Sequence, residues 1–249
     1  MKAILFYSLG NSPACRWATD FLNRSGISFV GHISPEITHL LLDVPSFSPD
    51  GNLRFGGDLA EFLRMLPQNI TIIGGNLQHP ALEGYRTLDL LRDESYLAEN
   101  AAITAHCALQ IAAPLLTGTL ADSPALVLGW GRIGKCLVRL LRALDCDVTV
   151  AARKERDRAM LEGLGYRAVD FGAALDGYRL IFNTVPELVI PEDKVSLCKN
   201  AVKIDLASRR GIAGEDVVWA RGLPGIHAPE SSGRLISGTV LRLLKEEAT

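Results

Sequence analysis

Three glycines between an apolar run and an amphipathic segment constrain the fold of this chain more than any other feature. The run Ala125-Leu126-Val127-Leu128 has the pattern of a buried strand and leads directly into Gly129-Trp130-Gly131-Arg132-Ile133-Gly134. Residues 147–152 have the pattern of a second strand, and the segment between carries a helical stripe of Val138, Leu140, Leu141 and Leu144. This spacing predicts a βαβ unit of about 30 residues.

Each glycine of such a motif has a physical role. The first permits a tight turn from strand to helix, the second lets backbone N–H groups approach a pyrophosphate, and the third lets the helix pack closely on the strand. The unpaired N–H groups and the dipole at the start of the helix favour a bound anion. The motif predicts a dinucleotide site made by Gly129, Trp130, Gly131, Arg132, Ile133 and Gly134; the alternative is a purely structural glycine turn.

The residues after the second strand bear on which coenzyme is bound. An NAD site of this type places Asp or Glu about 20 residues into the motif, whereas here the strand ends in Arg153-Lys154. A guanidinium can hydrogen-bond the 2′-phosphate that distinguishes NADP from NAD. The sequence therefore favours NADP, with Arg153 and Lys154 as contacts. The alternative is that these cations only solvate the start of a surface helix at 154–164.

Composition and charge exclude several other classes of protein. The 249 residues are 48% hydrophobic, with 26 basic against 28 acidic side chains. The net charge of −2 lacks the excess of positive charge that is typical of nucleic-acid-binding proteins. Five cysteines without a CxxC pair fit reduced thiols better than disulfides or a zinc site, and we expect no metal. The sequence has no run of about 18 apolar residues, so we expect a cytoplasmic protein without membrane contact.

The remaining patterns predict two α/β domains joined by a long helix. Strands are expected at 3–7, 28–33, 38–44, 70–73 and 85–91, helices at 12–22, 59–66 and 93–116, and a loop at 45–57. We expect residues 1–95 to form a smaller, flavodoxin-like α/β domain on the substrate side, with residues 96–118 as the interdomain helix. Residues 119–234 should form a Rossmann domain with a doubly wound parallel sheet, and helix 235–249 should pack back on the first domain.

Two further strands of the second domain end in polar loops. Strand 180–183 leads into Asn183-Thr184-Val185-Pro186, and strand 201–205 leads into Asp205-Leu206-Ala207-Ser208. Ligands of doubly wound sheets bind outside the carboxyl ends of the strands, so the expected cofactor contacts include Asn183, Thr184, Val185, Pro186, Asp205, Ala207 and Ser208. For Asn183 and Ser208, ordinary turn chemistry or helix capping is an equal alternative.

Taken together, these segments resemble the A subunit of dipicolinate synthase. The matching pieces are segments 129–134, 151–153, 183–186, 205–208 and the Pro/Gly loop Leu223-Pro224-Gly225-Ile226-His227-Ala228-Pro229. The resemblance implies an NADP-linked oxidation of dihydrodipicolinate to dipicolinate in bacterial sporulation. It also implies a small dicarboxylate substrate, a partner that is a flavoprotein-like B subunit, and a form similar to two-domain 2-hydroxyacid dehydrogenases. We further expect a homo-oligomer.

The chain departs from the pattern of that family at three places. Ile103-Thr104-Ala105-His106-Cys107 stands where members look like Pro-Thr-x-Glu-Gly, and segment 210–214 replaces a Pro-Gly-Gly. Glu230 stands where a lysine commonly follows the final Ala-Pro. Two alternatives therefore stay open: a noncatalytic NADP(H)-binding subunit or regulator that has lost the substrate site, and a dehydrogenase of another small carboxylate.

An oxidation that makes a dihydropyridine aromatic removes a hydride and a proton, so it needs a base. Imidazole suits this role near neutral pH, and His227 and His106 are the candidates, each with a packing or loop role as the alternative. The guanidinium fork matches a carboxylate, so we expect Arg16 to bind the substrate, with Asn100 and Thr104 as secondary contacts. The alternative for Arg16 is an exposed helix cation.

Overall fold

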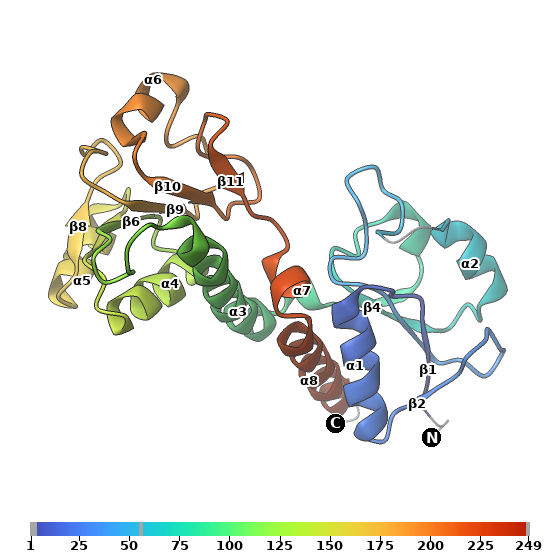
Figure 1. The fold of residues 1–249 in the computed structure, drawn as a ribbon. Helices are drawn as coiled ribbons and strands as arrows, with labels where there is room; N and C mark the ends of the chain where they lie inside the picture. Colours follow the sequence, from blue (N-terminus) through green and yellow to red (C-terminus); the bar gives the residue numbers. More distant parts are fainter. Residues whose placement is uncertain (1–3, 55–56, 248–249) are drawn as a thin grey trace. The chain divides into compact units, whose positions relative to one another are not determined.

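The chain folds into two compact units of α/β structure (Figure 1). The computed structural model describes residues 4–54 and 57–247. Ala3, at which the first predicted strand begins, residues 55–56 of the predicted loop and residues 248–249 of the last predicted helix lie outside this description. One unit comprises residues 1–100 and 224–249, and the other comprises residues 101–223. Within the described ranges, no helix combines the length and apolar character needed to cross a membrane.

The N-terminal unit contains a five-stranded parallel sheet in the order β2-β1-β3-β4-β5. Its strands are β1 (Leu5–Ser8), β2 (Ser28–Phe29), β3 (His39–Leu41), β4 (Thr71–Gly74) and β5 (Arg86–Asp89). This strand order is that of flavodoxin-like sheets, so the predicted smaller α/β fold is confirmed. A large part of its core is made of aliphatic side chains from β3, β4 and the helix α2 (Leu59–Met65) that lies between them in the chain, among them Leu40, Ile72, Leu59 and Leu63.

Two long helices of this unit pack side by side. The first, α1 (Pro13–Arg24), is capped by Ser12, whose hydroxyl accepts the Cys15 N–H at 3.1 Å. The second, α8 (Pro229–Glu247), lies along α1 (Figure 1). Gly233 permits this approach, because a Cβ there would collide with the Trp17 side chain and the α1 backbone. Shorter segments of the unit are α2 (Leu59–Met65), η1 (Pro80–Leu82) and η2 (Leu90–Arg92).

The other unit contains a six-stranded parallel sheet in the order β11-β10-β9-β6-β7-β8. Its strands are β6 (Ala125–Leu128), β7 (Val148–Ala151), β8 (Arg167–Val169), β9 (Leu180–Asn183), β10 (Val202–Asp205) and β11 (Val217–Trp219). Counted from β6 as the first strand, this is the order 3-2-1-4-5-6 of dinucleotide-binding sheets. The predicted Rossmann fold is confirmed, and its switch point lies between β6 and β9.

The helices of the second unit include the expected crossover helices after β6 and β7. These are α4 (Arg132–Ala143) and α5 (Glu155–Gly163), while the connection after β9 contains only α6 (Glu192–Val195) and η4 (Ser196–Cys198). The long helix α3 (Glu94–Ala112) passes from one unit into the other and is followed by η3 (Ala113–Leu115). It ends earlier than predicted because Pro114 lacks an N–H and disfavours the helical conformation of the residue before it.

Other predicted boundaries are wrong in ways that local chemistry explains. The predicted stiff loop after residue 222 is helical, since α7 (Leu223–His227) is followed directly by α8, which begins at Pro229 and not at residue 235. Proline is well tolerated in a first helical turn, so Pro224 and Pro229 mark helix starts here. Strands β8 and β11 are missed because each has three residues and forms an edge of the sheet.

A buried histidine makes the stability of the N-terminal unit depend on pH. His39 on β3 is 9% exposed, stacks on Phe6 with ring centroids 4.7 Å apart, and shares a 2.8 Å hydrogen bond with Thr38. Desolvation, together with the nearby Arg86, lowers the pKa of His39 to about 4.

Between pH 6.5 and pH 4, His39 is protonated in the unfolded chain but stays mostly neutral in the folded chain. The free energy of unfolding should therefore fall by about 2 to 3 kcal/mol between pH 7 and pH 4.5 through this group. His39→Phe should remove that part of the decrease in urea titrations at the two pH values, whereas substitution of the exposed His32 should retain it. Equal pH dependence in wild type and His39→Phe would contradict this assignment.

Candidate functional site

The first glycine of the motif forms the turn between β6 and α4. Gly129 has a φ of +105°, a conformation that side chains other than glycine rarely adopt. A Cβ at this position would also collide with the Thr184 hydroxyl and would lie 2.9 Å from a methyl group of Val185. The Thr184 hydroxyl itself donates to the Leu128 carbonyl at 2.9 Å. The turn after β6 is thus packed against the loop after β9, at the switch point of the sheet.

Gly134 is needed for close packing, whereas Gly131 lies at an open space. Gly134 lies in the first turn of α4, and a Cβ there would collide with the carbonyl oxygen of Gly129, so this glycine permits helix and turn to pack. Gly131 is the N-cap residue of α4, is exposed, and has no heavy atom within 4 Å of the place where a Cβ would be. The helix therefore begins at an open space, where the positive end of its dipole favours an anion.

A pocket of about 610 Å³ opens at this helix start, entirely within the second unit. Its floor is the turn Gly129-Trp130-Gly131. One wall comes from the segments after β7 and β8, and the other comes from the loop after β9. The charged residues of the lining are Arg153, Lys154, Asp157, Glu187 and Lys194. A dinucleotide bound in this fold would occupy this crevice.

Basic side chains follow the end of β7. Arg153 and Lys154 are exposed and line the pocket, and their contact with a coenzyme stays a prediction. The Arg153 guanidinium lies 3.3 Å from the Glu187 carboxylate, whereas the Lys154 ammonium has no ion pair within the described ranges. Arg158 has a different role, because it donates to the carbonyls of Ala152 at 2.8 Å and Arg153 at 3.0 Å and so fixes the turn that presents Arg153.

Asn183 and Asp205 brace the loops around the pocket. Both side chains are buried, and the Asp205 carboxylate accepts hydrogen bonds from the Asn183 amide at 2.9 Å and from the backbone N–H groups of Ala207, Gly211 and Ile212 at 3.1, 2.6 and 3.0 Å. The Asn183 amide also donates to the Val185 carbonyl at 3.0 Å and accepts the Val185 N–H. These bonds give both side chains a bracing role and agree with the turn alternative for Asn183, while a cofactor contact by Asn183 or Asp205 stays a prediction.

Gly211 joins the two loops. Its carbonyl accepts the N–H groups of Val189 at 2.8 Å and Ile190 at 3.0 Å, and a Cβ on it would lie 2.6 Å from the Glu187 carbonyl oxygen. The loop after β9, which lines the pocket, is therefore hydrogen-bonded to the connection between β10 and β11.

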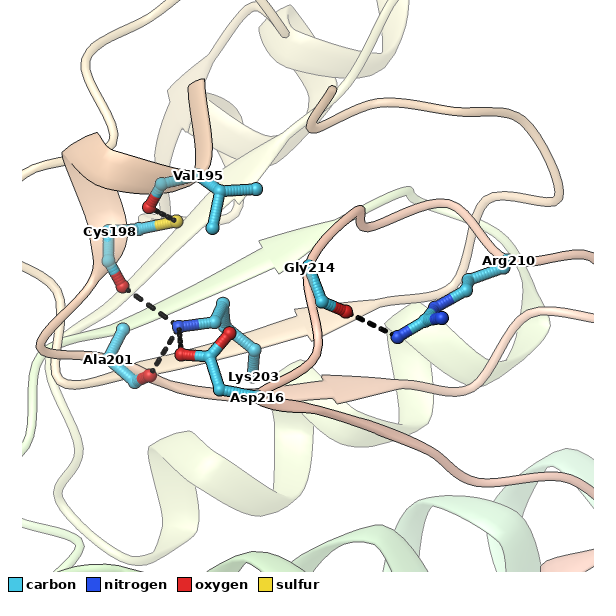
Figure 2. Close-up of polar contacts among 7 residues, drawn as sticks. All are labelled: Val195, Cys198, Ala201, Lys203, Arg210, Gly214 and Asp216. Atoms are coloured by element: carbon cyan, nitrogen blue, oxygen red, sulfur yellow. Dashed lines mark hydrogen bonds and ion pairs between the residues drawn. The ribbon is translucent and has the colours of Figure 1, made fainter. Parts of the chain in front are cut away.

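That connection is fixed at a third point by a buried lysine, which was not predicted from the sequence (Figure 2). The Lys203 side chain is fully buried; its ammonium donates to the Cys198 and Ala201 carbonyls at 3.2 Å each and lies 2.7 Å from the Asp216 carboxylate. Arg210 donates to the Gly214 carbonyl in the same loop (Figure 2). A lysine inside the apolar strand pattern 201–205 is the signal that could have indicated this, since buried charges require partners.

The other predicted cofactor residues occupy varied positions. Ala207 is buried, while Pro186 and Ser208 are exposed at the carboxyl ends of β9 and β10. Arg132 is the exposed first residue of α4, and Ile133 beside it is half-buried. Lys194 on α6, which was not among the predicted contacts, lines the pocket and has no ion pair in the part of the chain that is described.

The predicted catalytic and substrate residues are divided between the two units. Arg16, in the first turn of α1, and His227, at the end of α7, are exposed residues of the N-terminal unit, which also contains the half-buried Asn100. Thr104, which is buried, and His106, which is exposed, belong to the other unit. Neither unit alone contains the complete predicted substrate site.

Cysteine and metal chemistry add little to this site. All five cysteines are free, and four of them are buried. Within residues 4–54 and 57–247, no three His, Cys, Asp or Glu side chains form a group that could hold a metal ion.

Comparison with known proteins supports the resemblance noted in the sequence. No protein-family model matches the chain. The A subunit of dipicolinate synthase from Bacillus subtilis is 27% identical over 185 residues, which cover 68% of this chain and 62% of that protein. The alignment thus spans less than two thirds of the relative's length.

Solved structures share the fold over nearly the whole chain. The crystal structure of the A subunit of dipicolinate synthase from Bacillus halodurans superposes with a TM-score of 0.83 at 19% identity and covers 98% of both chains. A D-isomer specific 2-hydroxyacid dehydrogenase from Lactobacillus delbrueckii, solved with NAD, covers 97% of both chains with a TM-score of 0.55 at 11% identity. The chain is therefore a homologue of the A subunit of dipicolinate synthase and has a fold that it shares with dehydrogenases.

Proposed function

We propose that the chain is an NADP-linked oxidoreductase that oxidises dihydrodipicolinate to dipicolinate. The observation on which the proposal mainly rests is the geometry of the three glycines at the start of α4. Gly129 turns the chain, Gly134 packs against that turn, and Gly131 leaves the start of α4 open toward a pocket of about 610 Å³. Together with the homology to the A subunit of dipicolinate synthase, this arrangement favours a dinucleotide coenzyme over a structural turn.

The residues of the pocket fit a phosphorylated dinucleotide. The N–H groups at the start of α4 would hold its diphosphate, and Arg153 and Lys154 would hold a 2′-phosphate. When bound, the coenzyme supplies the acceptor for a hydride. We infer NADP over NAD because Arg153 and Lys154 stand after β7, where an NAD site of this type would carry Asp or Glu.

The chain itself must bind the substrate and accept its proton. Arg16 is exposed and can offer its guanidinium fork to a carboxylate, with Asn100 and Thr104 as further contacts. His227 and His106 are both exposed, and we assign to one of them the proton that leaves the ring carbon when the dihydropyridine becomes aromatic. By homology we further propose a role in bacterial sporulation, a partner that is a flavoprotein-like B subunit, and a homo-oligomeric state.

Ligand-dependent melting followed by a turnover assay tests this function. At about one hundred times Kd, NADP+ should stabilise the chain by roughly 2.7 kcal/mol, which corresponds to a rise in melting temperature of about 5 to 11 °C. Dihydrodipicolinate with NADP+ should then yield dipicolinate and NADPH, and either His227→Ala or His106→Ala should slow this turnover without changing the melting shift. A chain that melts identically with NADP+, NADPH, NAD+ and no ligand would contradict the proposal.

One observation favours a second candidate, a noncatalytic NADP(H)-binding subunit. Glu230 is exposed at the start of α8 and pairs with Arg234 at 3.2 Å, so a carboxylate stands where the resemblance to the family implies a lysine. Like charge disfavours a dicarboxylate nearby. Coenzyme binding without turnover of dihydrodipicolinate would support this candidate, and turnover of another small carboxylate would indicate a dehydrogenase of different specificity.

A further inference from the structure

Two opposite charges connect the walls of the coenzyme pocket. Arg153 follows β7, Glu187 lies in the loop after β9, and their guanidinium and carboxylate groups are 3.3 Å apart. In the sheet, β7 and β9 lie on opposite sides of β6, the strand that leads into the glycine turn. The ion pair therefore joins the two walls on either side of the place where we expect the diphosphate.

The pair can open without disturbing the fold. The Arg153 and Glu187 side chains are 72% and 65% exposed, and exposed ion pairs contribute little to stability. Their backbones are nevertheless well fixed, because Arg158 holds the carbonyl of Arg153 and Gly211 packs against the carbonyl of Glu187. Each charged group is thus presented from a firm loop and is free to exchange its partner for a ligand.

We propose that Glu187 is a specificity residue that sets how strongly the pocket distinguishes NADP from NAD. This inference rests on the proposed function. NAD sites of this fold use a carboxylate after the second strand to accept the ribose hydroxyls. Here Arg153 occupies that position, and the carboxylate is supplied from the opposite wall at 3.3 Å.

Arg153 should favour binding of NADP, whereas Glu187 should favour binding of NAD. The 2′-phosphate of NADP attracts Arg153 and is repelled by Glu187, with which it competes for the guanidinium. The free 2′-hydroxyl of NAD can donate a hydrogen bond to Glu187 but offers Arg153 no charge. Glu187 therefore weakens NADP binding, supports NAD binding and moderates the preference that Arg153 creates.

Isothermal titration of the full chain with NADP+ and NAD+ tests this role. Glu187→Gln removes the charge and keeps the size, so the ratio of Kd for NAD+ to Kd for NADP+ should rise about tenfold, which corresponds to about 1.4 kcal/mol. Arg153→Gln should lower the same ratio about tenfold or more. The matched control is Glu192→Gln, which removes an exposed carboxylate of the same connection that does not line the pocket, and it should leave the ratio unchanged.

The outcomes separate this inference from the proposed function. If the wild type and Glu187→Gln bind both dinucleotides with the same Kd ratio, Glu187 is not a specificity residue and the proposed function stands. If Glu192→Gln raises the ratio as much as Glu187→Gln, the effect is one of general charge and the inference is overturned. If the wild-type chain binds neither dinucleotide, the proposed function is overturned and the inference with it.

Discussion

Replacing Gly134 with alanine is expected to remove dinucleotide binding and to destabilise the unit of residues 101–223. The added Cβ would overlap the carbonyl oxygen of Gly129, which is backbone and cannot rotate away as a side chain can. Gly129 has no room to retreat, because Thr184 and Val185 pack against it. We expect a loss of about 1 to 3 kcal/mol or more in the free energy of unfolding. Binding of NADP+ in titration calorimetry should fall more than about a hundredfold, since helix and turn no longer meet correctly.

Gly163→Ala provides the matched control. Gly163 is the last residue of α5 in the same unit, and no heavy atom lies within 4 Å of its missing Cβ. Alanine there should leave binding unchanged and leave stability unchanged or raised by up to about 1 kcal/mol, because alanine favours a helix over glycine. Normal NADP+ affinity in Gly134→Ala would show that the contact with Gly129 does not shape the site.

Asp205→Asn is expected to be nearly as damaging, although it changes the volume of the side chain very little. The carboxylate accepts three backbone N–H groups and the Asn183 amide in a buried position. An asparagine turns one acceptor oxygen into an NH₂ group, so buried donors would face each other. We expect the free energy of unfolding to fall by about 3 kcal/mol or more. Hydrogen exchange should accelerate at the Gly211 and Ile212 amides, and coenzyme binding should weaken as the Glu187 wall loosens.

The exposed Asp193 on α6 offers a control for this experiment. Asp193→Asn should leave both stability and exchange at Gly211 close to those of the wild type, because surface substitutions of this kind have small effects. If Asp205→Asn were as stable as Asp193→Asn, the carboxylate would not be the brace of this connection, and a direct role toward the cofactor would regain support.

The glycine turn and the sheet around it could be predicted because their signals in the sequence are local. The glycines, the strand before them and the cations after the next strand occur within about 30 residues, the length of one βαβ unit. Strands β8 and β11 could not be predicted, because three-residue edge strands show too little apolar alternation. Helix α7 was mistaken for a loop, since Pro224 within a Pro/Gly segment favours both interpretations.

The roles of Asn183 and Asp205 could not be predicted for another reason. A polar residue at the end of a strand can face a ligand or brace a neighbouring loop, and only the partners of its atoms distinguish the two. The predicted catalytic residues His106 and His227 and the predicted substrate residue Arg16 come from segments far apart in the chain and from both units. Their joint action depends on how long-range segments assemble, which local patterns do not encode.

The packing of α8 on α1 affects the order in which the two units can fold during translation. Residues 224–249 complete the N-terminal unit, so α1 is translated early but gains its α8 neighbour only when that later segment leaves the ribosome. The unit of residues 101–223, by contrast, is continuous in sequence and can fold while translation is still under way. On a nascent chain, the unit that begins first is therefore the one that is finished last.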